Sequence, residues 1–302
     1  MTKNKNFTKA ILAAIGVYTL WGFSFMASDV GQRYVTPFTL LAYRFDVAVL
    51  LLTVPILLGK KKIRLKGKNI KPLLLLGTME PCLYFIGEQY GLRFTNSAFS
   101  GVMISVIPIV TMAMAAVFLK DKPSRLQWAF SFLSIAGIIV ITLSENSGGS
   151  VTLIGFLCLL VAVFAGSAYG VLTRKTSSDF SVYEQTFVMQ LMGAVFFTIL
   201  ALIENLGNMR AFVAPLTHGD FIIALLYMAL GASVAGYCLF NYAVAHAPMA
   251  NVISLCNLTT IVSVVAGIVF LKEPFSAVSV ISMIAVLIGI WGVQKFTPSE
   301  NT

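Results

Sequence analysis

Two glutamates stand inside a long apolar stretch of the sequence. Residues 78–91 read TMEPCLYFIGEQYG, with Glu80 directly before Pro81 and Glu88 further along. A charge near the middle of a bilayer costs about 2.5–3.5 kcal/mol on insertion scales, so an acid kept there is a candidate for function. Glu80 would carry a proton, form a fixed ion pair, or contact a solute.

Two more charged residues lie in the preceding apolar stretch. Arg44 and Asp46 are two positions apart, so they do not face each other on one helix. Arg44 is therefore expected to turn toward another helix, where it would pair with Glu80 or Glu88 or hold a substrate carboxylate. Asp46 is a second possible partner for Arg44, through a bend in the chain.

The polar and small residues around Glu80 share one side of a helix. At 100° per residue, Glu80, Tyr84, Gly87, Glu88 and Gly91 fall within roughly 100° of arc. A polar stripe on an otherwise apolar helix is expected beside a cavity in a helix bundle. A proline in this stripe frees a backbone carbonyl and kinks the helix, as occurs near the sites of transporters.

Aromatic and amide side chains in other apolar segments are expected to line the same cavity. Trp21 adjoins a glycine, and Tyr169 lies in a similar small-residue context in the second half of the chain. Packing and interfacial belts explain most aromatic residues in membranes, and asparagine also joins helices, so these residues have a structural alternative. The candidates are Trp21, Tyr84, Tyr169, Asn241, Tyr242 and Asn257, with Tyr18 and Tyr237 as further aromatics.

The elements that position these residues are predicted to be membrane-spanning helices. The chain of 302 residues is 58% hydrophobic and only 11% charged, which leaves too little polar surface for a protein of this size in water. Windows of about 20 apolar residues mark ten spans. They cover residues 8–28, 37–58, 71–91, 97–118, 126–144, 151–173, 182–204, 220–243, 249–271 and 276–294.

The distribution of basic residues predicts the orientation of these spans. Sixteen of the 21 Lys and Arg residues fall in the termini and the loops that share a side with them, seven of them between residues 60 and 71. By the positive-inside rule, both termini are expected in the cytoplasm of a multi-pass plasma-membrane protein. The basic loop is expected to contact anionic membrane lipids. Because the net charge of +9 is explained this way, no nucleic-acid partner is expected.

The sequence repeats itself with a shift of 152 residues. Between Tyr90 and Val140, eleven of 51 positions are identical without a gap, including the run Val117–Lys120 on Val269–Lys272. Each copy holds five spans, and because five is odd, the second copy enters the membrane in the opposite direction. The predicted fold is all-α, with ten transmembrane helices in two inverted-topology five-helix repeats, residues 8–145 and 150–295. Inverted repeats permit alternating access to a site between them.

Several short motifs resemble a known family. They are Trp21–Phe25, Pro37 with Arg44–Phe45, Tyr90–Ala98 with Pro108, Asn241–Ala243 and Leu271–Pro274. In their order and spacing, over nearly all of residues 8–295, the chain resembles the drug/metabolite transporter superfamily, in particular its EamA-type branch of ten-span carriers. The resemblance implies a carrier that moves small organic solutes, often outward, without ATP.

These patterns favour a secondary transporter over an enzyme. The chain has no P-loop, only two histidines and one aspartate inside a span, and its four cysteines are scattered singly. No cofactor or metal is therefore expected. We expect an exporter of metabolites such as amino acids, or of drug-like compounds, that works by alternating access around a central cavity. Proton antiport, exchange and facilitated diffusion all fit this pattern, so protons are one candidate partner. The alternative is a facilitative exchanger or a channel-like permease without proton coupling.

Overall fold

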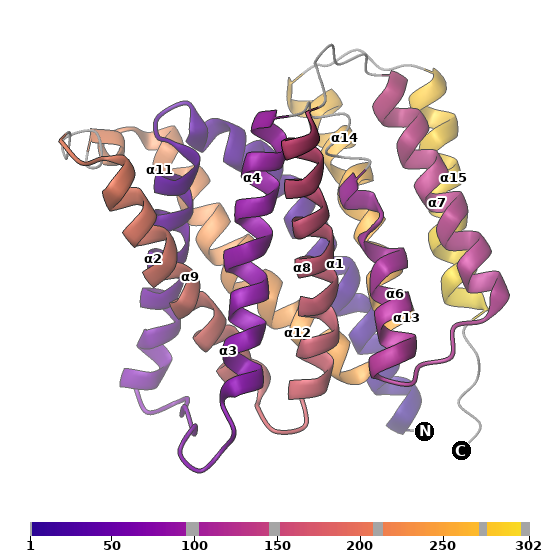
Figure 1. Ribbon diagram of the computed structural model, residues 1–302, viewed down its shortest axis with the longest axis horizontal. Helices are drawn as coiled ribbons and strands as arrows, with labels where there is room; N and C mark the ends of the chain where they lie inside the picture. The colour runs from indigo at the N-terminus through magenta and orange to yellow at the C-terminus, as the bar shows by residue number, and fades with distance from the viewer. Residues whose placement is uncertain (1, 95–102, 145–151, 208–213, 272–276, 297–302) are drawn as a thin grey trace.

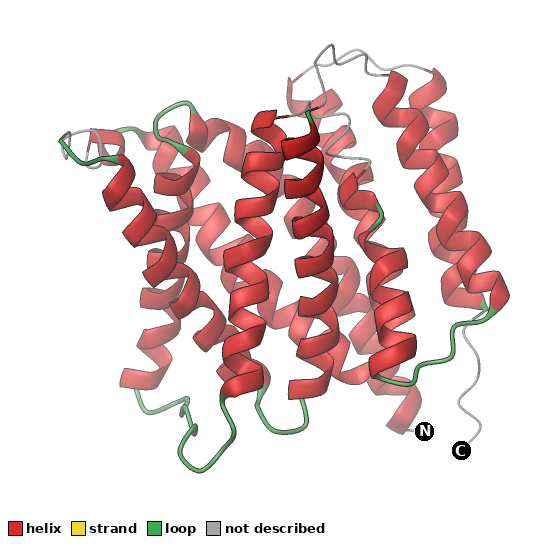
Figure 2. Ribbon diagram, viewed as in Figure 1, coloured by secondary structure: helices red, strands yellow, loops and turns green. Residues whose placement is uncertain are grey.

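The computed structural model describes residues 2–94, 103–144, 152–207, 214–271 and 277–296. Within these ranges every regular element is a helix (Figure 2). The predicted motif residues Thr95–Ala98 and Lys272–Pro274 lie outside the described ranges.

The first half of the chain forms five passes through the helical body. The third pass is divided into two α-helices by a π-helical turn, η1. The elements are α1 (Thr2–Gln32), α2 (Pro37–Leu57), α3–η1–α4 (Lys71–Gly77, Thr78–Leu83, Tyr84–Phe94), α6 (Ile107–Phe118) and α7 (Arg125–Ser144).

The second half has the same five-pass plan. Its third pass is again divided by a π-helical turn, η3. The elements are α8 (Leu153–Thr176), α9 (Val182–Glu204), α11–η3–α12 (Gly219–Leu226, Tyr227–Ala235, Gly236–His246), α13–η4–α14 (Met249–Ser254, Leu255–Asn257, Leu258–Leu271) and α15 (Ala277–Lys295). A short 3₁₀ turn, η2 (Ala214–Thr217), precedes α11.

The two halves run through the body in opposite directions. The start of α1 and the end of α15 lie at the same face, the lower edge of Figure 1. In contrast, α8 begins at the opposite face, where Thr152 donates its backbone N–H to the carbonyl oxygen of Phe94 at the end of α4 (3.2 Å). The predicted inverted arrangement of two five-helix repeats is confirmed by this topology.

Helix packing follows an approximate two-fold relation between the repeats. Equivalent helices pack on each other in two places, α2 on α9 and α7 on α15. The other main pairings come in matched pairs: α4 packs on α8 as α12 packs on α1, and α6 packs on α8 as α14 packs on α1. The turn η1 packs on α9 and the equivalent turn η3 packs on α2, so both interrupted passes lie against the α2–α9 pair.

The long helices begin at residues that suit helix starts. Thr36 accepts a hydrogen bond from the backbone N–H of Thr39, and Pro37 follows at the first helical position. Thr152 caps α8 in the same way. Ser181 and Glu184 form a reciprocal capping box at α9. These side chains satisfy backbone donors that a helix start leaves free.

Both third passes lose regular α-helical geometry at equivalent depth. In η1, Glu80 has φ −141° and ψ 123°, because the residue before a proline is disfavoured in the α region. The repeat shift of 152 places Glu80 on Ala232 and Pro81 on Ser233, both inside η3. The second copy therefore keeps the irregular turn without a proline, in a run of small residues from Gly231 to Gly236.

The outer surface of the body suits a membrane. Five helical segments in the described residues are long and apolar enough to cross a bilayer, and shorter apolar helices accompany them. Large hydrophobic side chains on the outer helices are exposed, such as Leu50, Phe132 and Ile281. An apolar exterior around a partly polar interior is expected for a helix bundle in lipid.

Candidate functional site

The polar centre of the molecule is built around Glu80. Its side chain is 8% exposed, and its Oε1 accepts a hydrogen bond from the hydroxyl of Tyr237 in α12 (2.7 Å). Glu80 lies nine residues into the third pass, about 13 Å along the helix axis from Lys71. The contact therefore joins the third passes of the two repeats well inside the bundle.

Arg44 reaches the same region from α2. Its buried guanidinium donates from Nε to the hydroxyl oxygen of Ser233 in η3 (2.7 Å), and it lies over the rings of Phe45 (5.5 Å) and Phe85 (5.3 Å). Because Ser233 and Tyr237 are four residues apart in the same pass, Arg44 and Glu80 contact neighbouring positions of one helix face.

The predicted ion pairs of Arg44 are not formed. Within the part of the chain that the structure describes, the ion pair within 4.0 Å is Lys68–Glu184, and neither Glu80 nor Glu88 pairs with Arg44 at that distance. Asp46 is likewise not the partner of Arg44. Instead, its two carboxylate oxygens accept from the hydroxyl of Thr198 in α9 (3.0 and 2.9 Å). The irregular η3 turn provides Arg44 with a hydroxyl acceptor instead of a carboxylate.

Carbonyl groups at η3 receive donors from two other helices. The indole Nε1 of Trp21 in α1 donates to the carbonyl oxygen of Ala232 (3.0 Å), and Nε2 of Gln190 in α9 donates to that of Ser233 (3.4 Å). A π-helical turn displaces backbone carbonyls from regular bonding, so these donors satisfy groups that would otherwise be costly to bury. Trp21 thereby lies beside the η3 turn, next to the contact of Arg44 with Ser233.

A second buried network lies between Glu80 and the face that carries the termini. The hydroxyl of Tyr169 in α8 donates to Oδ1 of Asn241 in α12 (2.8 Å), and Nδ2 of Asn241 donates to the hydroxyl of Thr186 in α9 (3.0 Å). All three side chains are at most 2% exposed. The predicted candidates Tyr169 and Asn241 are thus brought together, with Thr186 as a partner that spacing alone did not indicate.

Aromatic rings fill the space around these groups. The ring of Tyr237 lies 5.3 Å from Trp21 and 6.0 Å from Tyr169, and the ring of Phe240 stacks on Tyr169 at 5.2 Å. Tyr18 packs edge-on against Trp21 at 5.5 Å. These rings pack against one another around the buried polar groups.

Glu88 and Tyr84 stay on the same side of the third pass. The hydroxyl of Tyr84 donates to Oε1 of Glu88 (3.0 Å), and the ring of Tyr84 lies against Gly166 of α8. Both side chains are only partly buried, toward the face opposite the termini. They extend the polar stripe of Glu80 toward that face.

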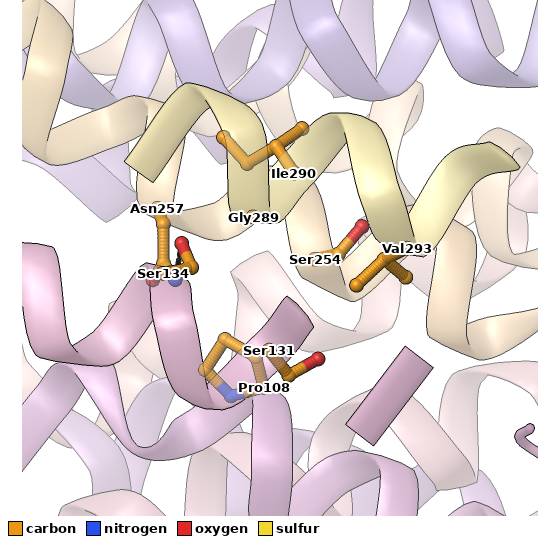
Figure 3. A pocket seen from close by; sticks show the side chains of 8 residues that line it. All are labelled: Pro108, Ser131, Ser134, Ser254, Asn257, Gly289, Ile290 and Val293. Carbon is orange, nitrogen blue, oxygen red and sulfur yellow. Dashed lines mark hydrogen bonds between the residues drawn. The ribbon is translucent and has the colours of Figure 1, made fainter. Parts of the chain in front are cut away.

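Two predicted cavity residues lie elsewhere. Tyr242 stacks on His246 (4.3 Å) near the end of α12. Asn257 donates from Nδ2 to the hydroxyl of Ser134 in α7 (2.7 Å) and lines a narrow pocket between α6, α7, α13–η4 and α15 (Figure 3). Asn257 therefore lies apart from the group around Glu80, because η4 turns its side chain toward α7.

The fold and the centre define a class of protein. A ten-pass inverted repeat, with buried charges between its halves at two interrupted helices, has the architecture of a membrane transporter. Comparison with known proteins agrees: the profile of the EamA-like transporter family matches residues 8–143 and again residues 153–294. The chain belongs to the EamA-like transporter family, which confirms the family resemblance of the motifs.

Individual relatives match nearly the whole chain. An uncharacterized transporter of Bacillus subtilis, YcxC, is 30% identical over 94% of this chain and 92% of its own length. An uncharacterized transporter of Archaeoglobus fulgidus is 25% identical over 95% and 99%. A solved crystal structure superposes with a TM-score of 0.82 at 16% identity, covering 98% of this chain and 99% of its own, which supports the fold alone.

Proposed function

We propose that this chain is a secondary carrier that moves small organic solutes outward across the plasma membrane by alternating access. The solutes are metabolites such as amino acids, or drug-like compounds. The observation that carries the proposal is the pair of irregular turns, η1 and η3, which recur at equivalent positions of the two repeats. Glu80 in η1 accepts a hydrogen bond from Tyr237, which follows η3 in α12. Interrupted helices at a repeat interface are where such carriers bind their solutes.

The charges at this interface support solute recognition. A buried cation and a buried carboxylate would normally pair with each other, but here each is held by a hydroxyl, Arg44 by Ser233 and Glu80 by Tyr237. Hydroxyl partners can be exchanged for a solute at a smaller electrostatic cost than an ion pair can be broken. In this proposal Arg44 binds an acidic group of the solute, and Glu80 binds a basic group or a proton.

The orientation of the carrier follows from the basic loops. In this proposal the face with both termini is cytoplasmic, since residues 60–71 at that face carry seven basic side chains and attract anionic lipids. The polar networks of Tyr169 and Asn241 then close the cytoplasmic half of the path. The stripe of Tyr84 and Glu88 lies toward the outside.

The proposal is tested by reconstitution into liposomes. Amino acids, nucleosides and lipophilic cations are screened for uptake with an inside-acid gradient and without one. We expect saturable flux of one solute class, and we expect Glu80→Gln to flatten its dependence on pH. Equal rates for Glu80→Gln and wild type at every pH would remove the proton role, while flux that does not saturate would favour a channel-like permease. The exposed Glu204→Gln serves as the matched control.

A further inference from the structure

The packing pattern divides the central helices into two bodies. In the first body, α4 packs closely on α8: a Cβ at Gly87 would lie 2.7 Å from the carbonyl oxygen of Cys158 and 2.8 Å from the backbone nitrogen of Ala162. In the second body, α12 packs on α1, where Gly236 lies against Trp21. Alternating access requires these two bodies to separate first at one face and then at the other.

Arg174 joins the two bodies at the face that carries the termini. It is in the last turn of α8, and its Nη1 donates to the carbonyl oxygens of Val244 (2.7 Å) and Ala247 in the final turn and C-cap of α12. The last carbonyls of a helix have no partner within the helix and carry partial negative charge. A guanidinium is therefore well matched to them, and its removal leaves them without this donor.

Between Arg174 and η3, the contacts that hold α12 are weaker or lie within the central group around Glu80. Tyr169 and Thr186 hold Asn241 through neutral hydrogen bonds. Further up, α12 is continuous with the π-helical η3 (Tyr227–Ala235), a type of irregular turn that often marks functional movement. The segment α12 thus has an irregular turn at one end and a charged contact at the other.

We propose that Arg174 is the latch that keeps the terminal face of the transport path closed, and that its release lets α12 move away from α8 and α9 about η3. This inference rests on the alternating access proposed above, and it adds a gating residue outside the central site around Glu80. Breaking a hydrogen bond of a charged group shifts the balance between closed and open forms by at least about tenfold.

The test measures labelling of the native Cys238 by a membrane-impermeant maleimide, located by peptide mass spectrometry. Cys238 lies one turn before Asn241, with its Sγ 3.7 Å from the hydroxyl of Thr186, so it is partly covered while α12 lies against α9. Full-length protein in oriented vesicles is labelled separately from each face. The variants are Arg174→Gln and, as the matched control, Lys175→Gln, which removes the same charge from an exposed neighbour.

We expect Arg174→Gln to raise the labelling rate of Cys238 from the terminal face by about tenfold or more, and Lys175→Gln to leave it unchanged. An unchanged rate in Arg174→Gln, or an equal rise in both variants, would overturn the proposal. A rise at all four native cysteines from both faces would also overturn it, because Arg174 would then be needed for the fold. Labelling needs no solute, so absence of flux in wild type would count against the proposed function alone.

Discussion

The contact between the two interrupted helices allows a quantitative prediction. Tyr237→Phe removes only the hydroxyl that lies 2.7 Å from Oε1 of Glu80, and it keeps the ring contacts with Trp21 and Tyr169. Tyr237 is 1% exposed and Glu80 8%, so water does not replace the lost donor. A hydrogen bond to a charged group typically contributes about 1.5–3 kcal/mol, and we expect a loss of that size in the free energy of unfolding.

A double-mutant cycle isolates this contact from other effects. Unfolding free energies are measured by denaturant titration in micelles for Tyr237→Phe, for Glu80→Met and for the double variant. We expect the double variant to lose about 1–3 kcal/mol less than the sum of the single losses. Tyr183→Phe, whose hydroxyl donates to the carbonyl oxygen of Leu52, should be additive with Glu80→Met. Additivity of Tyr237→Phe and Glu80→Met within about 0.5 kcal/mol would refute the contact.

Three further variants test other parts of the structure. Glu184→Gln should speed hydrogen exchange in the loop of basic residues, because the carboxylate accepts from that loop's backbone and from a lysine; unchanged exchange would contradict these contacts. Gly292→Ala should lower the melting temperature, because a Cβ there would lie 2.1 Å from the ring of Phe130. Gly16→Ala should not, because its Cβ would lie 3.4 Å from the nearest atom, in Leu239. Equal melting temperatures of the two variants would contradict the α7–α15 packing. Asn257→Ala should lower the free energy of unfolding by about 1 kcal/mol and leave the KM for the solute unchanged. A large rise in KM would indicate that Asn257 contributes to the central site.

The course of the chain through the membrane was predictable because it depends on local composition. Apolar runs and basic loops determine where each pass begins and ends, and the repeat shift indicates the inversion. The irregular turn at Glu80 could also be predicted from the sequence, since Pro81 disfavours helical geometry at the residue before it. The equivalent turn at η3 was not, because Ala232 and Ser233 occupy those positions and neither residue breaks a helix by itself.

The partners of the buried charges were less predictable, because they depend on which helices meet. Composition identified Arg44 and Glu80 as special, but the choice between a carboxylate and a hydroxyl partner depends on the rotation of α12 and η3 against α2. Nothing in the sequence marks Ser233, a single serine in an apolar run, as the partner of a buried charge. Asn257 is the same residue type as Asn241 and also lies in an apolar segment, but the turn of η4 directs its side chain to a partner in α7.

The central claim is that one site between the repeats is exposed to each side of the membrane in turn. Counterflow in proteoliposomes tests it most directly: vesicles are loaded with unlabelled solute, and the entry of a trace of labelled solute is followed without any ion gradient. We predict saturable entry that is stimulated by the solute inside and overshoots equilibrium, and we predict its loss in Arg44→Gln. Entry that rises linearly with concentration and is indifferent to the solute inside would contradict alternating access.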